Sequence, residues 1–193
     1  MKKIKIIASL YLLTNLTFCK AQQTYPLKTD YTEISNNSYL KDINNELNNF
    51  AGNWVSSFNG NEIKLFISKE NYKYFKRGSH IFNKDVLSIR YFVKNSNGTI
   101  LQDTQNMIFQ NNQITHTIYS LWPENGGNTI VLYYGGTNCG IGWGEIILQK
   151  LNSTQFSWQY NPNSRVIDSA TCPPNVDKNV YLPEIKDLIF TKQ

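Results

Sequence analysis

Apolar and polar residues alternate with a period of two over much of the chain after residue 50. The alternation is clearest at 63–67, 87–93 and 156–160, where one set of side chains is Ile, Leu, Val or aromatic. This period is typical of strands with one buried face. Further strand-like runs lie at 54–58, 72–75, 100–102, 106–109, 115–121, 129–134, 145–151 and 187–191.

Turn-forming sequences separate these runs. They are Asn59-Gly60, Asn97-Gly98, Asn125-Gly126-Gly127, Gly135-Gly136 and Asn161-Pro162. Many short strands joined by such turns predict an antiparallel barrel or a curved sheet. The stretch 161–181 carries no periodicity and is expected to be irregular, and the segment at 22–34 is expected to form a loose arm.

A helical period occurs at one place before the strands. The apolar residues there are Leu40, Ile43, Leu47 and Phe50, with Ser38 as the N-cap and Gly52 just past the end. The segment is rich in asparagine, so its intrinsic helix propensity is poor. We expect one N-terminal helix that depends on packing against the sheet. The predicted fold is therefore mainly β, a barrel or curved sheet with one N-terminal helix.

The first residues have the layout of an export tag. Lysines lead an apolar run at 6–13, and Cys19-Lys20-Ala21 ends the segment. We expect residues 1–21 to be a signal peptide and 22–193 to form a single β-rich domain in the periplasm or outside the cell. The apolar run is too short for a membrane span. The alternative is that Cys19 becomes the lipidated first residue of a surface lipoprotein, although Phe18 is bulky for that cleavage box.

Removal of residues 1–21 changes the charge of the chain. The tag holds four of the 19 basic residues and none of the 14 acidic ones, which leaves a nearly neutral domain. Nucleic-acid binders usually carry a strong basic excess. We therefore expect no nucleic-acid partner.

Two cysteines remain after the tag, Cys139 and Cys172. In an oxidising compartment an even count favours a disulfide, with two thiols as the alternative. The residues that could carry catalysis or bind metal lack a recognisable pattern. His80 and His116 have no ligand spacing around them, so no metal site and no cofactor are expected. A hydrolase triad could be drawn from His116 with Asp168 and Ser120 or Ser169, but no nucleophile motif accompanies it.

Aromatic residues are the remaining signal. Binding proteins use exposed aromatics to hold sugars or apolar ligands, whereas β-cores favour the same residues for packing. For each of them core packing is the first interpretation and ligand contact the alternative. The residues concerned are Trp54, Trp122, Trp143, Trp158, Tyr133 and Tyr134.

Gly52-Asn53-Trp54 resembles the Gly-x-Trp motif that opens the first strand of lipocalins. The resemblance implies a structural role for both residues, with Trp54 closing one end of a barrel. It also implies that a basic side chain from the end of the chain, Lys186 or Lys192, packs over the indole in a cation–π contact.

The whole chain resembles an uncharacterised family of small exported flavobacterial proteins (domain of unknown function 6705). The similar features are the lysine-led leader, the Phe-x-Gly-x-Trp start, Cys-Pro-Pro-Asn at 172–175, and the ending from Leu182-Pro183 to 190–193. This resemblance implies a bacterial envelope or secreted location and brings no activity.

These observations lead to two main functional hypotheses. The first is a non-enzymatic barrel that binds a small apolar ligand, its interior lined by residues such as Ile63, Leu65, Ile67, Leu87 and Ile89. The second is a surface module that holds a polysaccharide or a protein through exposed Trp122, Trp143 and Trp158.

Overall fold

The computed structural model describes residues 21–110, 113–164 and 172–193. Apart from Ala21, the predicted export tag and Cys19 lie outside the described residues. So do Asp168 and Ser169 of the possible triad.

The regular secondary structure of the described chain is almost entirely strand. The strands are β1 (Thr24–Pro26), β2 (Ser38–Lys41), β3 (Gly52–Phe58), β4 (Asn61–Arg77), β5 (His80–Lys94), β6 (Ile100–Asp103), β7 (Ile118–Glu124), β8 (Thr129–Tyr134), β9 (Trp143–Lys150), β10 (Gln155–Ser164) and β11 (Leu188–Lys192). Three short 3-10 turns accompany them: η2 (Glu46–Asn49), η3 (Asn125–Gly127) and η4 (Asn138–Gly140).

Eight of these strands close into an antiparallel barrel in the order β5-β4-β3-β11-β10-β9-β8-β7. The ring closes where β7 pairs with the middle of β5, at Ser88↔Tyr119 and Ile89↔Ile118. Three strands lie outside the ring: β6 pairs with the end of β5, while β2 and then β1 add in parallel to its beginning. The predicted antiparallel barrel is thus confirmed.

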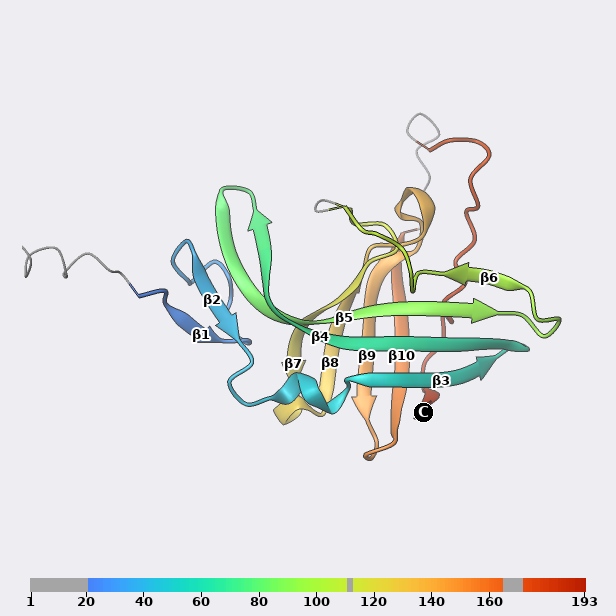
Figure 1. Ribbon diagram of the computed structural model, residues 1–193, viewed down its shortest axis with the longest axis horizontal. Coiled ribbons are helices and arrows are strands. Elements are labelled where there is room, and N and C mark those ends of the chain that lie inside the picture. Colours follow the sequence, from blue (N-terminus) through green and yellow to red (C-terminus); the bar gives the residue numbers. More distant parts are fainter. Residues whose placement is uncertain (1–20, 111–112, 165–171) are drawn as a thin grey trace, which may run out of the picture.

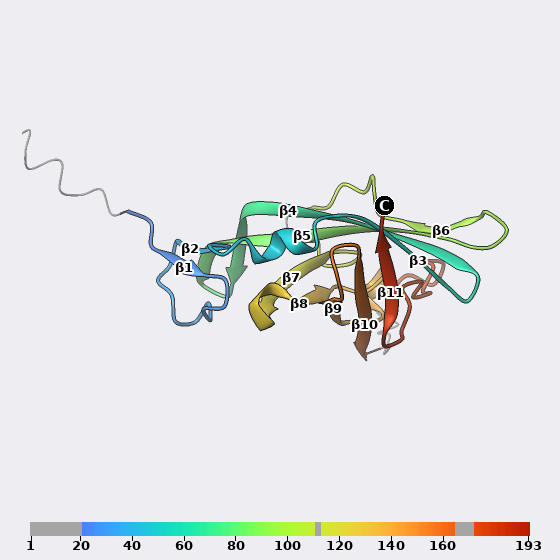
Figure 2. The same ribbon diagram turned by 90° about the horizontal axis from the view of Figure 1, so that it is seen from below.

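The barrel is flattened into two layers. Strands β3, β4 and β5 run across strands β7 to β10, which lie behind them in the first view and below them in the second (Figures 1 and 2). Strands β4 and β5 are the longest, and their shared hairpin extends past the barrel toward β1 and β2 (Figure 1). This extension, the arm before β2 and strand β7 together frame the site described below.

The barrel's interior is filled with the chain's own side chains. Ile63, Leu65, Ile67, Leu87 and Ile89 point inward as expected, but they belong to one buried cluster. The cluster includes the fully buried Trp54, Trp158, Tyr91, Tyr134, Phe50, Phe156 and Phe190. These five aliphatic residues therefore form core, and the expectation that they line a ligand cavity is not supported.

The predicted N-terminal helix is wrong. Residues 38–41 form strand β2, whose Ser38–Leu40 pair with Phe82–Lys84 of β5, and only the short turn η2 follows. Asn45 has a left-handed backbone (φ 55°), which ends any continuous helix there. Leu40, Leu47 and Phe50 are buried while Ile43 is 55% exposed. The spacing of the apolar residues therefore indicated which side chains are buried, but not a helix.

The arm at 22–34 is ordered, contrary to expectation. It contributes β1, and its Leu27 and Ile34 are buried in the core cluster. The run at 106–109 forms no strand, and Asn161-Pro162 is no turn because β10 continues through it with an irregularity at Pro162.

Candidate functional site

One hollow in the described part of the chain lies outside the barrel. It is a groove of about 640 Å³ between the arm, the β4–β5 hairpin and β7. Its volume is within the range of small-molecule sites, roughly 300–1,000 Å³. The lining residues are Leu27–Tyr31, Leu40, Phe75, Arg77, Phe82, Lys84 and Tyr119–Asn125.

A row of aromatic rings crosses this groove. Phe75 and Phe82 are cross-strand partners on the hairpin, and their rings stack at 5.6 Å. Tyr31 of the arm stacks on the other side of Phe82, also at 5.6 Å, and Tyr119 of β7 contacts Phe75 at the same distance. Tyr31 is 40% exposed at the end of the row. Its ring can therefore contact a flat ligand.

Three cations line the same groove, Lys28, Arg77 and Lys84, and the last two hydrogen-bond to β7. Arg77 Nη2 donates a hydrogen bond to the Tyr119 hydroxyl at 2.9 Å, and Lys84 Nζ donates one to the Leu121 carbonyl oxygen. The ion pairs of the described residues include neither of them. Burial, together with the nearby Arg77 charge, lowers the pKa of Lys84 to about 8.

The two acids of the groove have partners within their own segments. Asp30 accepts hydrogen bonds from the Thr32 backbone N–H and hydroxyl, both at 2.8 Å, and these bonds lower its pKa. Glu124 accepts one from Trp122 Nε1 at 3.1 Å. Neither carboxylate forms a salt bridge with a groove cation in the described chain.

The Gly-x-Trp motif lies at the start of β3. Trp54 is buried and donates from Nε1 to the Phe50 carbonyl oxygen at 2.8 Å. Lys192 Nζ lies 5.3 Å from the centre of its ring, so of the two candidate lysines it is Lys192 that makes this cation–π contact. Gly52 has φ 133°, and a Cβ there would lie 2.8 Å from Lys192 Cε. Glycine is thus required by the backbone and by the close approach of the lysine.

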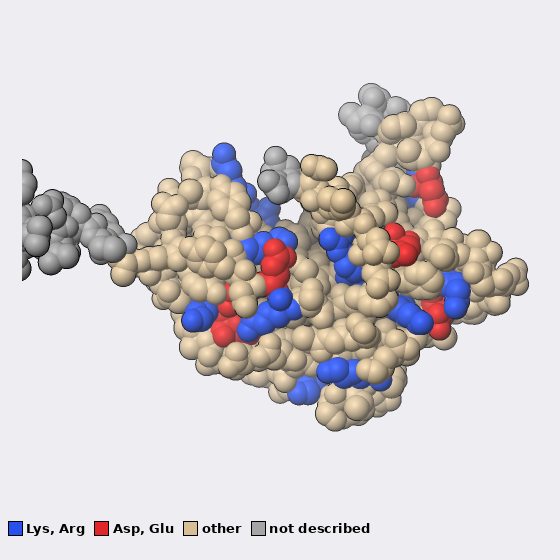
Figure 3. Space-filling model, in the orientation of Figure 1, with Lys and Arg blue, Asp and Glu red and all other residues tan. Residues whose placement is uncertain are grey.

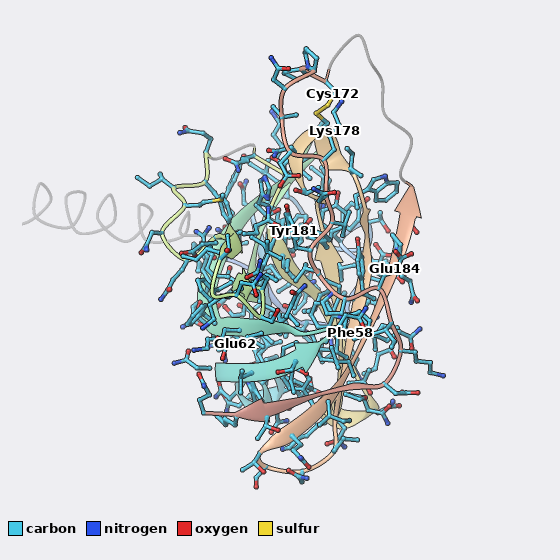
Figure 4. All side chains as sticks on the ribbon, turned by 90° about the vertical axis from the view of Figure 1, so that its right-hand side faces the viewer. Phe58, Glu62, Cys172, Lys178, Tyr181 and Glu184 are labelled. Carbon is cyan, nitrogen blue, oxygen red and sulfur yellow. A yellow bond between two sulfur atoms is a disulfide. The ribbon has the colours of Figure 1, made fainter. Side chains whose placement is uncertain are left out.

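Cys139 and Cys172 form the predicted disulfide. It lies at one end of the molecule, and from Cys172 the chain runs past Lys178, Tyr181 and Glu184 toward β11 (Figure 4). The Asn138 amide also donates to the Asp177 carbonyl oxygen at 2.8 Å. The bridge therefore attaches the irregular segment after 172 to the η4 turn.

His116 has two side-chain hydrogen-bond partners. Its Nδ1 lies 3.0 Å from Gln102 Nε2, and its Nε2 lies 3.1 Å from Asn138 Oδ1. Ser120 is buried, and its hydroxyl oxygen accepts the Leu87 N–H at 2.8 Å. These contacts give both residues structural roles. His80 is the first residue of β5, and its ring is about 6 Å from those of Tyr31 and Phe82.

The tryptophans divide between core and surface. Trp158 is fully buried, and its Nε1 donates a hydrogen bond to the Pro183 carbonyl oxygen. The hypothesis that Trp158 is exposed and binds a partner is therefore wrong. Trp122 and Trp143 are exposed, at 41% and 40%, but only Trp122 lines the groove. Tyr134 is buried in the core and Tyr133 is half-buried beside Tyr119.

Sequence reasoning missed Tyr31, Phe75, Arg77, Phe82 and Lys84. The sequence does show that Phe75 and Arg77 are two residues apart, as are Phe82 and Lys84. In a strand this spacing places both members of a pair on the same face. The arm and β7 complete the groove from distant parts of the sequence.

Other features of the described residues bear on metals, membranes and nucleic acids. No group of three or more His, Cys, Asp or Glu side chains in this part of the chain is placed to hold a metal ion. No helix of the described chain has the length and apolarity to cross a membrane. On the face drawn in Figure 3, basic and acidic side chains are interspersed, without an extended basic patch.

Comparison with curated proteins and with solved structures finds no match. A family model does match, and it covers residues 1–193. The chain therefore belongs to a family of unknown function, DUF6705.

Proposed function

We propose that this chain is an exported, non-enzymatic binding protein of the cell envelope, which holds its ligand in the groove beside the barrel. Export rests on the tag-like sequence of residues 1–21. Binding rests on one observation: a single groove holds both a row of aromatic rings and two cations, Arg77 and Lys84, that form no ion pair in the described chain. A few well-placed polar groups in a mostly apolar concave surface are typical of ligand sites.

The barrel itself acts as the scaffold in this proposal. Its packed aromatic core fixes β4, β5 and β7, and the hairpin of β4 and β5 presents the site. The contact between Lys192 and Trp54 supports a lipocalin-like manner of closing one barrel end. The proposed binding site differs from a lipocalin interior because it lies on the flank.

Native mass spectrometry of protein recovered from its own cell envelope tests the proposal. We expect extra mass that leaves on denaturation, that is lost in Trp122→Ala, and that is kept in Trp143→Ala. The two tryptophans are almost equally exposed, but only one lines the groove, so the second is a matched control. A bare protein mass, or equal loss in both variants, would contradict binding in the groove.

A second candidate function is a surface module for polysaccharide or protein. The exposure of both Trp122 and Trp143 favours it, since exposed aromatics can stack on sugar rings. Retention on envelope polysaccharide that depends on Trp143 as well as Trp122 would favour this function over small-ligand binding.

A further inference from the structure

We propose that the groove selects an organic anion, a carboxylate or a comparable acidic group on a flat apolar body, with Arg77 and Lys84 as its anion-binding pair. This inference rests on the proposed binding function of the groove and names the class of ligand.

The charge of the groove is the first step. Its lining holds three basic residues, Lys28, Arg77 and Lys84, and two acids, Asp30 and Glu124. Both acids accept hydrogen bonds from their own segments, and no ion pair in the described chain includes Arg77 or Lys84. Two cations in one groove without a carboxylate partner are a suitable site for an anion from outside.

The hydrogen-bonding capacity of the two cations is the second step. Arg77 uses one N–H for the Tyr119 hydroxyl, and Lys84 uses one for the Leu121 carbonyl oxygen. Their remaining donors can bind a carboxylate, and the planar guanidinium fork suits a bidentate contact. Burial and, to a lesser extent, the Arg77 charge lower the pKa of Lys84, so the two charges repel, and an anion bound beside both would relieve that repulsion.

The shape and polarity of the groove are the third step. Leu27 and Leu40 form apolar parts of its lining, and the stacked rings of Phe75, Phe82 and Tyr31 give it a flat aromatic side. A purely inorganic anion would leave this apolar surface uncovered. An acid group on a flat apolar body meets both parts of the groove.

A pair of isosteric probes tests the inference. The probes are 2-naphthoate and 2-naphthamide, which share the ring and differ in charge, and their affinities are measured by calorimetry at pH 7 and constant ionic strength. We expect the acid to bind about ten-fold or more tightly than the amide. Arg77→Gln and Lys84→Met should each lower the affinity for the acid by a similar factor and leave the affinity for the amide almost unchanged.

Lys76→Gln is the matched control. It removes a charge from the same strand at an exposed position outside the groove, so it should change neither affinity. Equal binding of acid and amide, or unchanged acid binding in both groove variants, would overturn anion selection. If the amide binds and Trp122→Ala weakens it, the groove still binds ligands while the anion inference fails. If neither probe binds, the anion inference fails, and the native mass spectrum alone decides whether the groove holds another ligand.

Discussion

At the scale of single residues, Lys84 lies in an environment that disfavours its charged form. Burial, with the Arg77 charge nearby, lowers its pKa to about 8 in the folded protein, against 10.5 for an ordinary lysine. Between these values the unfolded chain binds more protons than the folded one, so this residue makes stability rise with pH from about 8 to 10.5. At neutral pH the charged Lys84 therefore costs stability.

Lys84→Met should accordingly stabilise the protein at pH 7, by on the order of 1–3 kcal/mol, because the methionine removes the charge and keeps an apolar stem. The advantage should shrink by pH 10, where the wild-type lysine is mostly neutral in the fold. Urea unfolding at both pH values measures this, with exposed Lys76→Met as the control. If Lys84→Met is less stable than wild type at pH 7, or if the difference in unfolding free energy is the same at both pH values, the charged lysine does not cost stability.

Gly52 is the second residue whose identity follows from geometry. Gly52→Ala should destabilise the fold by about 2–3 kcal/mol, because φ 133° is strained for alanine and the new Cβ displaces Lys192 from Trp54. Urea unfolding measures the loss. Gly78→Ala is the control, since it has φ 61° with nothing within 4 Å, and it should cost about 1 kcal/mol. Equal costs would show that the Lys192 contact is unimportant.

At the scale of elements, the segment from β2 to η2 shows where sequence patterns mislead. Three of the four apolar residues at helical spacing are buried there, but the backbone follows a strand and then a short turn. Asp42 holds this shape: its carboxylate accepts the backbone N–H groups of Glu46 and Leu47 and pairs with Lys69 at 2.7 Å. The pairing with Lys69 is long-range, so a local period could not reveal it.

Asp42→Ala should destabilise the protein by about 3–5 kcal/mol, because it leaves Lys69 and two backbone donors without their acceptor. Asp42→Asn keeps an acceptor and should cost less. Urea unfolding of these variants, and of Asp42→Ala combined with Lys69→Met, measures the coupling. If Asp42→Ala costs no more than about 1 kcal/mol, the carboxylate does not hold the segment.

Most strands were predictable because their alternation is local. The run at 129–134 coincides with β8, and those near 54, 87 and 156 lie inside β3, β5 and β10. The runs at 63–67 and 72–75 proved to be one strand, β4, which bends at an irregularity between Glu70 and Lys73. The short strands β1 and β2 escaped detection because parallel pairing between distant residues defines them: β2 pairs with β5, and β1 pairs with β2.

At the scale of the whole molecule, the barrel interior and the proposed binding site are separate. The ring of eight strands encloses a packed core, while the groove forms where the long hairpin leaves the ring and meets the arm and β7 (Figure 1). The sequence indicated a barrel and a disulfide, but it could not locate a groove whose residues come from 27–31, 40, 75–84 and 119–125. Only the closed fold brings these segments together.

The four tryptophans offer the most direct test of this separation. Trp54 and Trp158 lie in the barrel core, Trp122 lines the groove, and Trp143 is exposed elsewhere. The measurement is a two-dimensional ¹H–¹⁵N spectrum of their indole N–H groups, assigned by Trp→Phe variants, during titration with 2-naphthoate. We predict that the Trp122 signal shifts while the other three stay in place. Shifts of Trp54 and Trp158 with Trp122 unchanged would place the ligand inside the barrel and contradict the account.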